Sequence, residues 1–406
     1  MALLAFALGA ASALAQQPRF RAGPNTGFRP SPNISKPTGH WQSPAACAGT
    51  RATQHHNLCY LMIPIDLVPG KTDITPNALN SKGRVIGFGY DASDDLDVAY
   101  MWFKGGGTRP LPVLPGVFNT WPFSINDRDE IVGQDLLGDP AAPLQIGWFW
   151  KPGMKQYAVL SPLRDGDQNV GVNQIDHAGR IVGYSGPGYP DQVEAVLWES
   201  YKVAPTPLKG PPGAWTSARA INAKRPPQLA GAANLKGTDT WLALQWRAPH
   251  LAPDVLPDLG GGQAIAVSIN DNKQIAGWSA TDSNDPFGTA HAVLWEDGQV
   301  IDLAPSNLWS LASSVNSLNH DGQIVGGVVM ADGLEHAALW ETACDDIKMI
   351  DLNDCVAQTT SHFFFYYADG INDDGSIIVD AYDLRDPAQL NRAFLLVPLH
   401  GTGARR

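Results

Sequence analysis

The sequence predicts an all-β chain folded as a seven-bladed β-propeller, and three observations lead to that prediction. One short phrase recurs seven times between positions 80 and 397, at a spacing of about 48 residues, which is typical of one folding unit copied around an array. Each copy holds four short apolar stretches separated by turn residues, without the periodicity of a helix. The last copy lacks its fourth stretch, and a matching stretch stands before the first copy.

Each copy begins with a strand that ends at an Asn or Asp, here called the anchor. The anchors are Asn80, Asn126, Asp176, Asn222, Asn270, Asn319 and Asn372. A tight turn follows, because Asn caps its own backbone and a nearby Gly, as at Gly83, accepts a positive φ. The third strand of each copy ends at Trp102, Trp150, Trp198, Trp246, Trp295 and Trp340, with Leu396 in the seventh place. We interpret these Trp residues and the I-V-G phrase as packing between blades, since a small sheet must stack on its neighbours.

The fifth copy shows the unit most clearly. Its strands are expected over residues 264–270, 274–278, 291–295 and 299–303. Four short antiparallel strands per copy are typical of a propeller blade.

The two ends of the chain complete one another. The seventh copy supplies three strands, and residues 60–67 match the fourth strands of other copies through Ile65-Asp66-Leu67. We predict that this N-terminal strand completes the last blade and closes the ring, so that residues 58–398 form one propeller without an exposed edge. Residues 399–406 are expected to be a tail.

The N-terminal region is expected to lie outside the propeller. Residues 1–15 form an apolar run that ends in a small-residue pattern, which predicts a signal peptide and export. Residues 16–57 are rich in Pro and Gly and predict a flexible leader. No later stretch approaches the ~20 apolar residues of a membrane helix, so no transmembrane segment is expected.

Charge and cysteine content limit the partners. The net charge of -12 argues against nucleic acid, and we expect a monomer without a required cofactor. Disulfides are expected in an exported chain among Cys47, Cys59, Cys344 and Cys355. The pairing stays open: a strand between the last two separates its ends by ~17–20 Å, whereas a bridge tolerates ~7 Å between Cα atoms, so Cys59 with Cys344 is an alternative to the local pairs.

The repeated phrases resemble a known family. I-V-G after an Asn turn, His-Ala before an apolar-Trp pair, as at His291 and His336, and Asp-Leu are together similar to the HAF repeat family of bacterial extracellular proteins. The resemblance covers residues 60–398 and implies a repeat fold and a secreted or periplasmic location. It implies no established activity, and only two of the seven copies keep the His.

Candidate binding residues are the ones that do not repeat. The loops between second and third strands vary in length and composition, so we predict a functional face opposite the anchor turns, with a glycan or protein as ligand. Aromatic residues that precede the innermost strands are expected to line the channel mouth there. They are Trp121, Trp215, Trp309, Tyr366 and Tyr367. The alternative is that they fill the channel mouth as core.

Two further sets of residues are candidates for a metal site and for a catalytic site. Asp91, Asp94, Asp95 and Asp97 concentrate oxygen ligands that could hold Ca²⁺, although they match no EF-hand spacing and also fit a solvated loop. Asp165, Asp167 and His362 enter inner strands and could converge as an acid-base set. The sequence therefore predicts an exported binding or interaction module. The alternative is a propeller enzyme that hydrolyses or cleaves glycans by lyase chemistry.

Overall fold

A computed structural model describes residues 60–399, except 92, 94–95, 140–141, 188–192, 237, 239, 286–289, 305–311, 344–345 and 357–361. The predicted signal peptide and leader, residues 400–406 of the predicted tail, and Cys47, Cys59 and Cys344 lie outside the described residues. The regular structure of the described part is β-strand, apart from a short 3-10 helix η2 at Leu352–Cys355. No helix in this part is long and apolar enough to cross a membrane.

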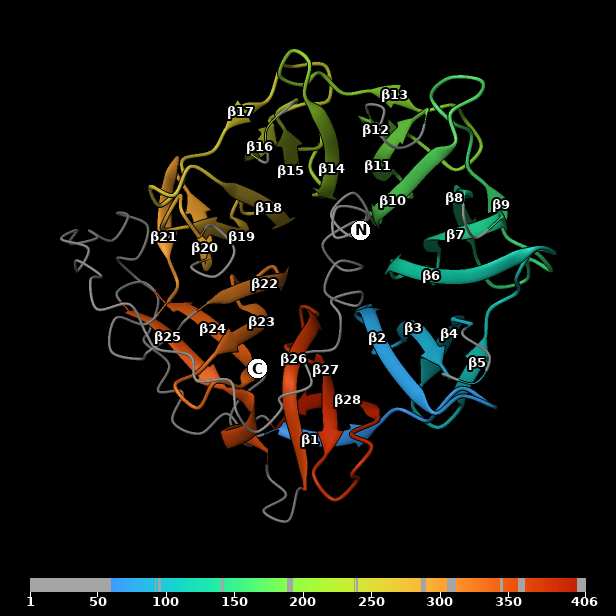
Figure 1. The fold of residues 1–406 in the computed structure, drawn as a ribbon, viewed down its shortest axis with the longest axis vertical. Helices are drawn as coiled ribbons and strands as arrows, with labels where there is room; N and C mark the ends of the chain where they lie inside the picture. The colour runs from blue at the N-terminus through green and yellow to red at the C-terminus, as the bar shows by residue number, and fades with distance from the viewer. Residues whose placement is uncertain are drawn as a thin grey trace, which may run out of the picture.

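The strands form four-stranded antiparallel units placed radially around a central axis (Figure 1). The inner strands are β2 (Asp73–Leu79), β6 (Val117–Ile125), β10 (Asn169–Ile175), β14 (Trp215–Ile221), β18 (Ala264–Ile269), β22 (Ser313–Leu318) and β26 (Phe363–Ile371). The second strands are β3 (Val85–Tyr90), β7 (Ile131–Asp139), β11 (Ile181–Gly186), β15 (Leu229–Asn234), β19 (Ile275–Ala280), β23 (Ile324–Val329) and β27 (Ile377–Asp383).

In most units the fourth strand is the shortest. The third strands are β4 (Val98–Phe103), β8 (Ala142–Trp150), β12 (Glu194–Trp198), β16 (Trp241–Trp246), β20 (Ala290–Glu296), β24 (Glu335–Ala343) and β28 (Asn391–Pro398). The fourth strands are β5 (Gly107–Pro110), β9 (Ala158–Val159), β13 (Thr206–Pro207), β17 (Asp254–Val255), β21 (Gln299–Asp302), β25 (Asp346–Asp351) and β1 (Tyr60–Pro64). The units β6–β9 and β10–β13 are joined into one eight-stranded sheet by a single parallel pairing, Asn169 with Gln145. The four strands predicted in the fifth copy correspond to β18, β19, β20 and β21.

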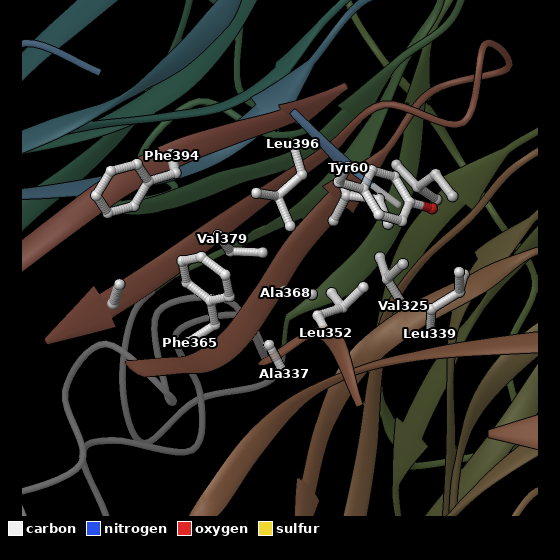
Figure 2. Close-up of a cluster of buried hydrophobic side chains, with 13 residues drawn as sticks. Tyr60, Val325, Ala337, Leu339, Leu352, Phe365, Ala368, Val379, Phe394 and Leu396 are labelled. Atoms are coloured by element: carbon white, nitrogen blue, oxygen red, sulfur yellow. The ribbon is translucent and has the colours of Figure 1, made fainter. Parts of the chain in front are cut away.

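The N-terminal strand lies beside the C-terminal one. β1 pairs antiparallel with β28, from Tyr60 opposite Pro398 to Pro64 opposite Phe394, and is shorter than the predicted strand at 60–67. Tyr60 is 1% exposed and packs among side chains of β23, β24 and β26–β28, together with Leu352 (Figure 2). This packing fixes the start of the described chain between the last two units.

The core is divided into layers between neighbouring sheets. Each layer combines the second and third strands of one unit with the inner strand of the next, as expected for sheets that bury both faces. The repeated Trp residues are all buried, which agrees with the packing role predicted for them. Several also donate from the indole Nε1 to a carbonyl in the segment that leaves the preceding sheet, such as Trp198 to Ser161 at 2.9 Å and Trp246 to Lys209 at 2.7 Å.

The His-Ala and Asp-Leu phrases are connected across two strands. His291 of β20 contacts Asp302 of β21 through Nδ1 at 2.9 Å, and His336 of β24 contacts Asp351 of β25 at 2.6 Å. The Nε2 atom of His336 also contacts Asp332 at 3.0 Å, and these two carboxylates, acting against burial, raise the pKa of His336. Each His therefore ties the third strand to the fourth within one sheet.

Candidate functional site

Every inner strand carries a β-bulge at the same place, three residues before its anchor. The pairing register with the second strand skips one residue there, for example Arg219 between Ala218 and Ala220. We call the skipped residues the bulge ring: Asn77, Phe123, Asn173, Arg219, Val267, Asn316 and Asp369. Bulges redirect a side chain out of the strand alternation and occur often at functional sites.

The glycine of the I-V-G phrase is explained by the bulge. Gly183 of β11 pairs with Val172, immediately before the bulged Asn173, and a Cβ atom on Gly183 would lie 2.0 Å from the carbonyl oxygen of Gly171. Gly231 would meet the Ser217 carbonyl oxygen at 2.1 Å in the same way. The repeated Gly therefore makes room for the displaced backbone of the inner strand.

The bulge ring lines a central cavity of about 320 Å³, together with the residues that lead to the anchors, all anchors except Asn319, and the first residue after each anchor. This volume lies at the lower end of the range of small-molecule sites, which is roughly 300–1,000 Å³. Because the anchors belong to its wall, the cavity lies at the anchor-turn end of the channel. The functional face predicted on the opposite, variable-loop side stays a prediction.

The anchors connect neighbouring sheets by hydrogen bonds. Each anchor Oδ1 accepts from backbone amides of its own turn, as Asn319 does from Gln323 at 2.9 Å. Each anchor Asn donates from Nδ2 to the carbonyl oxygen of the next anchor: Asn80 to Asn126, Asn126 to Asp176, Asn222 to Asn270, Asn270 to Asn319, Asn319 to Asn372, and Asn372 to Asn80, at 3.0–3.3 Å. We call this set of bonds the anchor circuit.

Asp176 cannot donate, and an arginine replaces the missing bond. Arg180 donates from Nε to Asp176 Oδ2 at 2.6 Å and from a terminal nitrogen to the Asn222 carbonyl at 3.2 Å. Both side chains are buried, at 9% and 2% exposure. The Asp-Arg pair thus carries the circuit from Asp176 to Asn222 in place of an asparagine.

Arg219 is the bulge-ring residue without a counter-charge. Its Nε is buried without a hydrogen-bond partner, and none of the described residues forms an ion pair with its guanidinium. Burial lowers the pKa of Arg219 to about 10, with the nearby Tyr184 acting in the opposite direction, so the group stays cationic at neutral pH.

Asp369 is the acidic residue of the bulge ring and belongs to β26, which lies across the channel from β14 (Figure 1). Its Oδ2 is buried and has no partner among the described residues. Burial first, and then the charges of Asp380 and Glu335, raise the pKa of Asp369 well above its ordinary range. Burial also raises the pKa of Asp380 to about 8 and that of Glu335 to about 7. Burial and these neighbouring acids therefore favour the protonated form of Asp369.

The predicted aromatic residues do not line this cavity. Trp121 is 6% exposed and donates to Asp97 Oδ2 at 2.7 Å, and Trp215 is half-buried at the start of β14. Tyr367 is buried and contacts Ser314, while Tyr366 donates to Asn391 Oδ1 at 3.1 Å. Trp309 lies outside the described residues. A role of these residues in ligand binding stays a prediction.

The catalytic candidates are not joined to one another. Asp165 is exposed, Asp167 accepts from Ser185 at 2.6 Å, and His362 lies 3.5 Å from Asp383. No hydrogen bond or ion pair of the described residues links any two of the three. The geometry therefore gives no support for an acid-base pair made by these residues.

The calcium candidates are used locally. The Ser93 side chain, and after it the Ser93 amide at 2.7 Å, lower the pKa of Asp91 by hydrogen bonding. Asp97 Oδ2 accepts from the Trp121 indole. Asp94 and Asp95 lie outside the described residues. Among the residues that are described, no group of three or more His, Cys, Asp and Glu could hold a metal ion.

Comparison with solved structures places the fold. The β-propeller domain of the Trilobed protease from Pyrococcus furiosus, described as having an open velcro topology, aligns with a TM-score of 0.51 at 10% identity, over 80% of this chain and 94% of that chain. The fold of this chain is β-propeller-like. YCF48 bound to D1 peptide aligns with a TM-score of 0.47 at 10% identity, over 86% and 99%. The Pyrococcus horikoshii acylaminoacyl peptidase aligns with a TM-score of 0.48 at 7% identity, over 84% of this chain and 52% of that chain.

No protein-family model and no curated protein matches the chain. The identities to the solved structures are so low that they bear on the fold alone.

Proposed function

We propose that this protein is a closed seven-bladed propeller that acts as a binding module, with its ligand held in the central cavity at the anchor-turn end. Support for closure comes from three contacts between the chain ends: β26 with β2, β1 with β28, and the hydrogen bond from Asn372 to Asn80. A ring held in this way is a rigid frame for residues that project inward.

The observation that carries the proposal is the bulge ring. The same backbone feature turns one side chain per inner strand toward the cavity, and those side chains differ in charge, size and polarity. Residues needed only for folding would be expected to repeat, as the anchors and the buried Trp residues do. A variable lining on a repeated frame is the arrangement expected of a binding site.

Binding is favoured over catalysis because Asp167 and His362 contact different partners and Asp165 is exposed. Membership of the HAF repeat family, export to a secreted or periplasmic location, a monomeric state, and a glycan or protein as ligand all remain part of the proposal. The disulfide pairing of Cys355, which is half-buried, also stays a prediction.

A channel-filling variant tests the proposal. Val267 lines the cavity, and Val267→Trp would fill it, whereas Val255→Trp adds the same side chain at an outer position that is 55% exposed. Purified wild type and both variants are applied to glycan and peptide arrays. We expect ligands of the wild type to be kept by Val255→Trp and lost by Val267→Trp. Ligands that both variants keep would lie outside the channel and would refute this site.

A further inference from the structure

The inference concerns Arg219 and rests on the proposed binding function. The side chain lies at the bulge of β14, borders the central cavity, and has a buried Nε without a partner. Other buried or partly buried arginines of this protein are paired: Arg180 bonds Asp176, and Arg392 donates to the Thr72 carbonyl at 2.9 Å. Arg219 thus differs from these arginines, because its Nε has no hydrogen-bond partner among the described residues.

An unpaired cation beside a cavity weakens the folded state. Taking a guanidinium out of water without a partner costs free energy, and a buried donor left unsatisfied adds to that cost. Nothing in the packing of β14 requires a charge, since the same position is Val267 in the next unit and Phe123 in another. Such a local conflict on a regular scaffold is expected where a residue serves binding.

The neighbouring polar residues do not compete for a ligand anion. Asn77, Asn173 and Asn316 of the bulge ring donate from Nδ2 to carbonyl oxygens of the next inner strand, at 2.7, 2.8 and 2.7 Å. Burial and the neighbouring acids raise the pKa of Asp369, on the far wall, and so favour the neutral form of its carboxyl group. Arg219 is therefore the charged donor that faces the cavity without an internal acceptor.

The cavity entrance sets the charge of the ligand. Asp127, Asp271 and Asp373 stand one residue beyond their anchors, and each accepts from a backbone amide of the preceding unit at 2.8–2.9 Å. These carboxylates would repel a multiply charged anion such as a phosphate ester more strongly than a monoanion. A guanidinium offers two parallel N–H donors that match a carboxylate.

We propose that the central cavity binds the carboxylate group of a small organic acid, and that Arg219 is the residue that receives it. The site takes a monoanion small enough for a cavity of about 320 Å³. Its specificity comes from the Arg219 guanidinium, which lies behind an entrance lined by carboxylates.

Trifluoroacetate is the probe, observed by ¹⁹F NMR in titrations of the full chain. We expect wild type to bind it, Arg219→Gln to weaken binding at least about tenfold, and Arg219→Lys to retain part of it. Arg247→Gln is the matched control, because Arg247 is 68% exposed, lies outside the cavity lining and pairs with Asp254. Inorganic phosphate is titrated in parallel and is expected to bind more weakly than trifluoroacetate.

The Arg219→Gln variant should fold, since it removes an unpaired charge, and without ligand its Tm should equal or exceed that of wild type. A second measurement uses wild type alone: with ¹⁵N-arginine, the Arg219 Nε–H resonance should move on titration. An unmoved resonance, binding by Arg219→Gln within about twofold of wild type, or tighter binding of phosphate would overturn the assignment.

The two proposals can fail separately. If Val267→Trp loses its array ligands while trifluoroacetate ignores Arg219, the channel binds ligands but the carboxylate assignment is wrong. If trifluoroacetate depends on Arg219 while array ligands ignore Val267→Trp, the carboxylate site stands and the wider proposal for glycan or peptide ligands fails.

Discussion

The anchor circuit can be tested by moving its natural exception to another unit. Asn319 donates from Nδ2 to the Asn372 carbonyl at 3.1 Å and to Gln323 Oε1 at 2.9 Å, and it is 3% exposed. Asn319→Asp keeps the acceptor for the turn but removes both donations and places a carboxylate against two oxygen atoms. Each buried acceptor left without a donor costs roughly 1–3 kcal/mol, so we expect a loss of about 3 kcal/mol.

Gln323→Arg should recover much of that loss in the Asn319→Asp background. The pair would then match Asp176 and Arg180, in which the arginine bonds both the carboxylate and the carbonyl of the next anchor. Gln323→Arg alone is the control and lacks the carboxylate to bind.

Urea unfolding of wild type, both single variants and the double variant gives the coupling free energy. We expect about 1.5–2 kcal/mol in favour of the double variant. A coupling below about 0.5 kcal/mol, or a neutral Asn319→Asp, would show that the circuit does not stabilise the ring in the way described.

Three further predictions concern burial. Burial raises the pKa of Glu335 from 4.5 to about 7, so between these values the folded state keeps a proton that the unfolded chain releases. The contribution of Glu335 to the free energy of unfolding is therefore fully present below pH 4.5 and is lost as the pH rises through 7. In urea unfolding, the stability of Glu335→Gln relative to wild type should therefore rise by about 2–3 kcal/mol between pH 4 and pH 9, where the lower value allows for partial exposure of Glu335. A stability difference that does not change with pH would contradict this cause. Gly183→Ala should destabilise the fold by about 2–3 kcal/mol, because its Cβ would lie 2.0 Å from a backbone oxygen. Gly370→Ala should destabilise it less, since the nearest atom belongs to the Leu79 side chain at 3.0 Å. Equal losses of Tm in the two variants would argue against the bulge explanation. Tyr60→Ala should cost about 3–5 kcal/mol and speed proteolysis at the N-terminal strand, and an unchanged cleavage rate would show that β1 is not fixed by this side chain.

The fold was largely predictable because its causes repeat. Asn turns, the buried Trp and the I-V-G phrase each solve the same packing problem in every copy, so one copy read as four strands predicts the rest. The pairing of β1 with β28 followed from counting strands at the two ends. The predicted strand at 60–67 was too long, since only Tyr60–Pro64 belongs to β1.

The bulge ring was not predictable from the same repetition. Its members share a position but not a residue type, from Asn77 to Phe123 to Arg219, so no phrase marks them. The I-V-G glycine did carry a signal for the bulge, because a repeated glycine between bulky second-strand residues indicates that another backbone segment comes close to it. The Asp176 and Arg180 pair offered a second signal, since a single Asp among the anchors coincides with an arginine four residues later. The sequence instead favoured aromatic residues as binding residues, yet the Trp121 indole donates to Asp97 in the structure.

The division of labour within each inner strand explains why the cavity, and not the anchor turns, offers a ligand new contacts. The anchor circuit uses the anchor side chains and the anchor carbonyls, so few of those groups remain for a ligand, and changing them weakens the frame. Three residues earlier the bulge removes one side chain from strand alternation, and replacing that side chain leaves the anchor circuit intact. Arg219 occupies this position, and its Nε has no hydrogen-bond partner among the described residues. A new ligand specificity can therefore arise at the bulge ring by single substitutions, while the anchors and the I-V-G glycines must be kept.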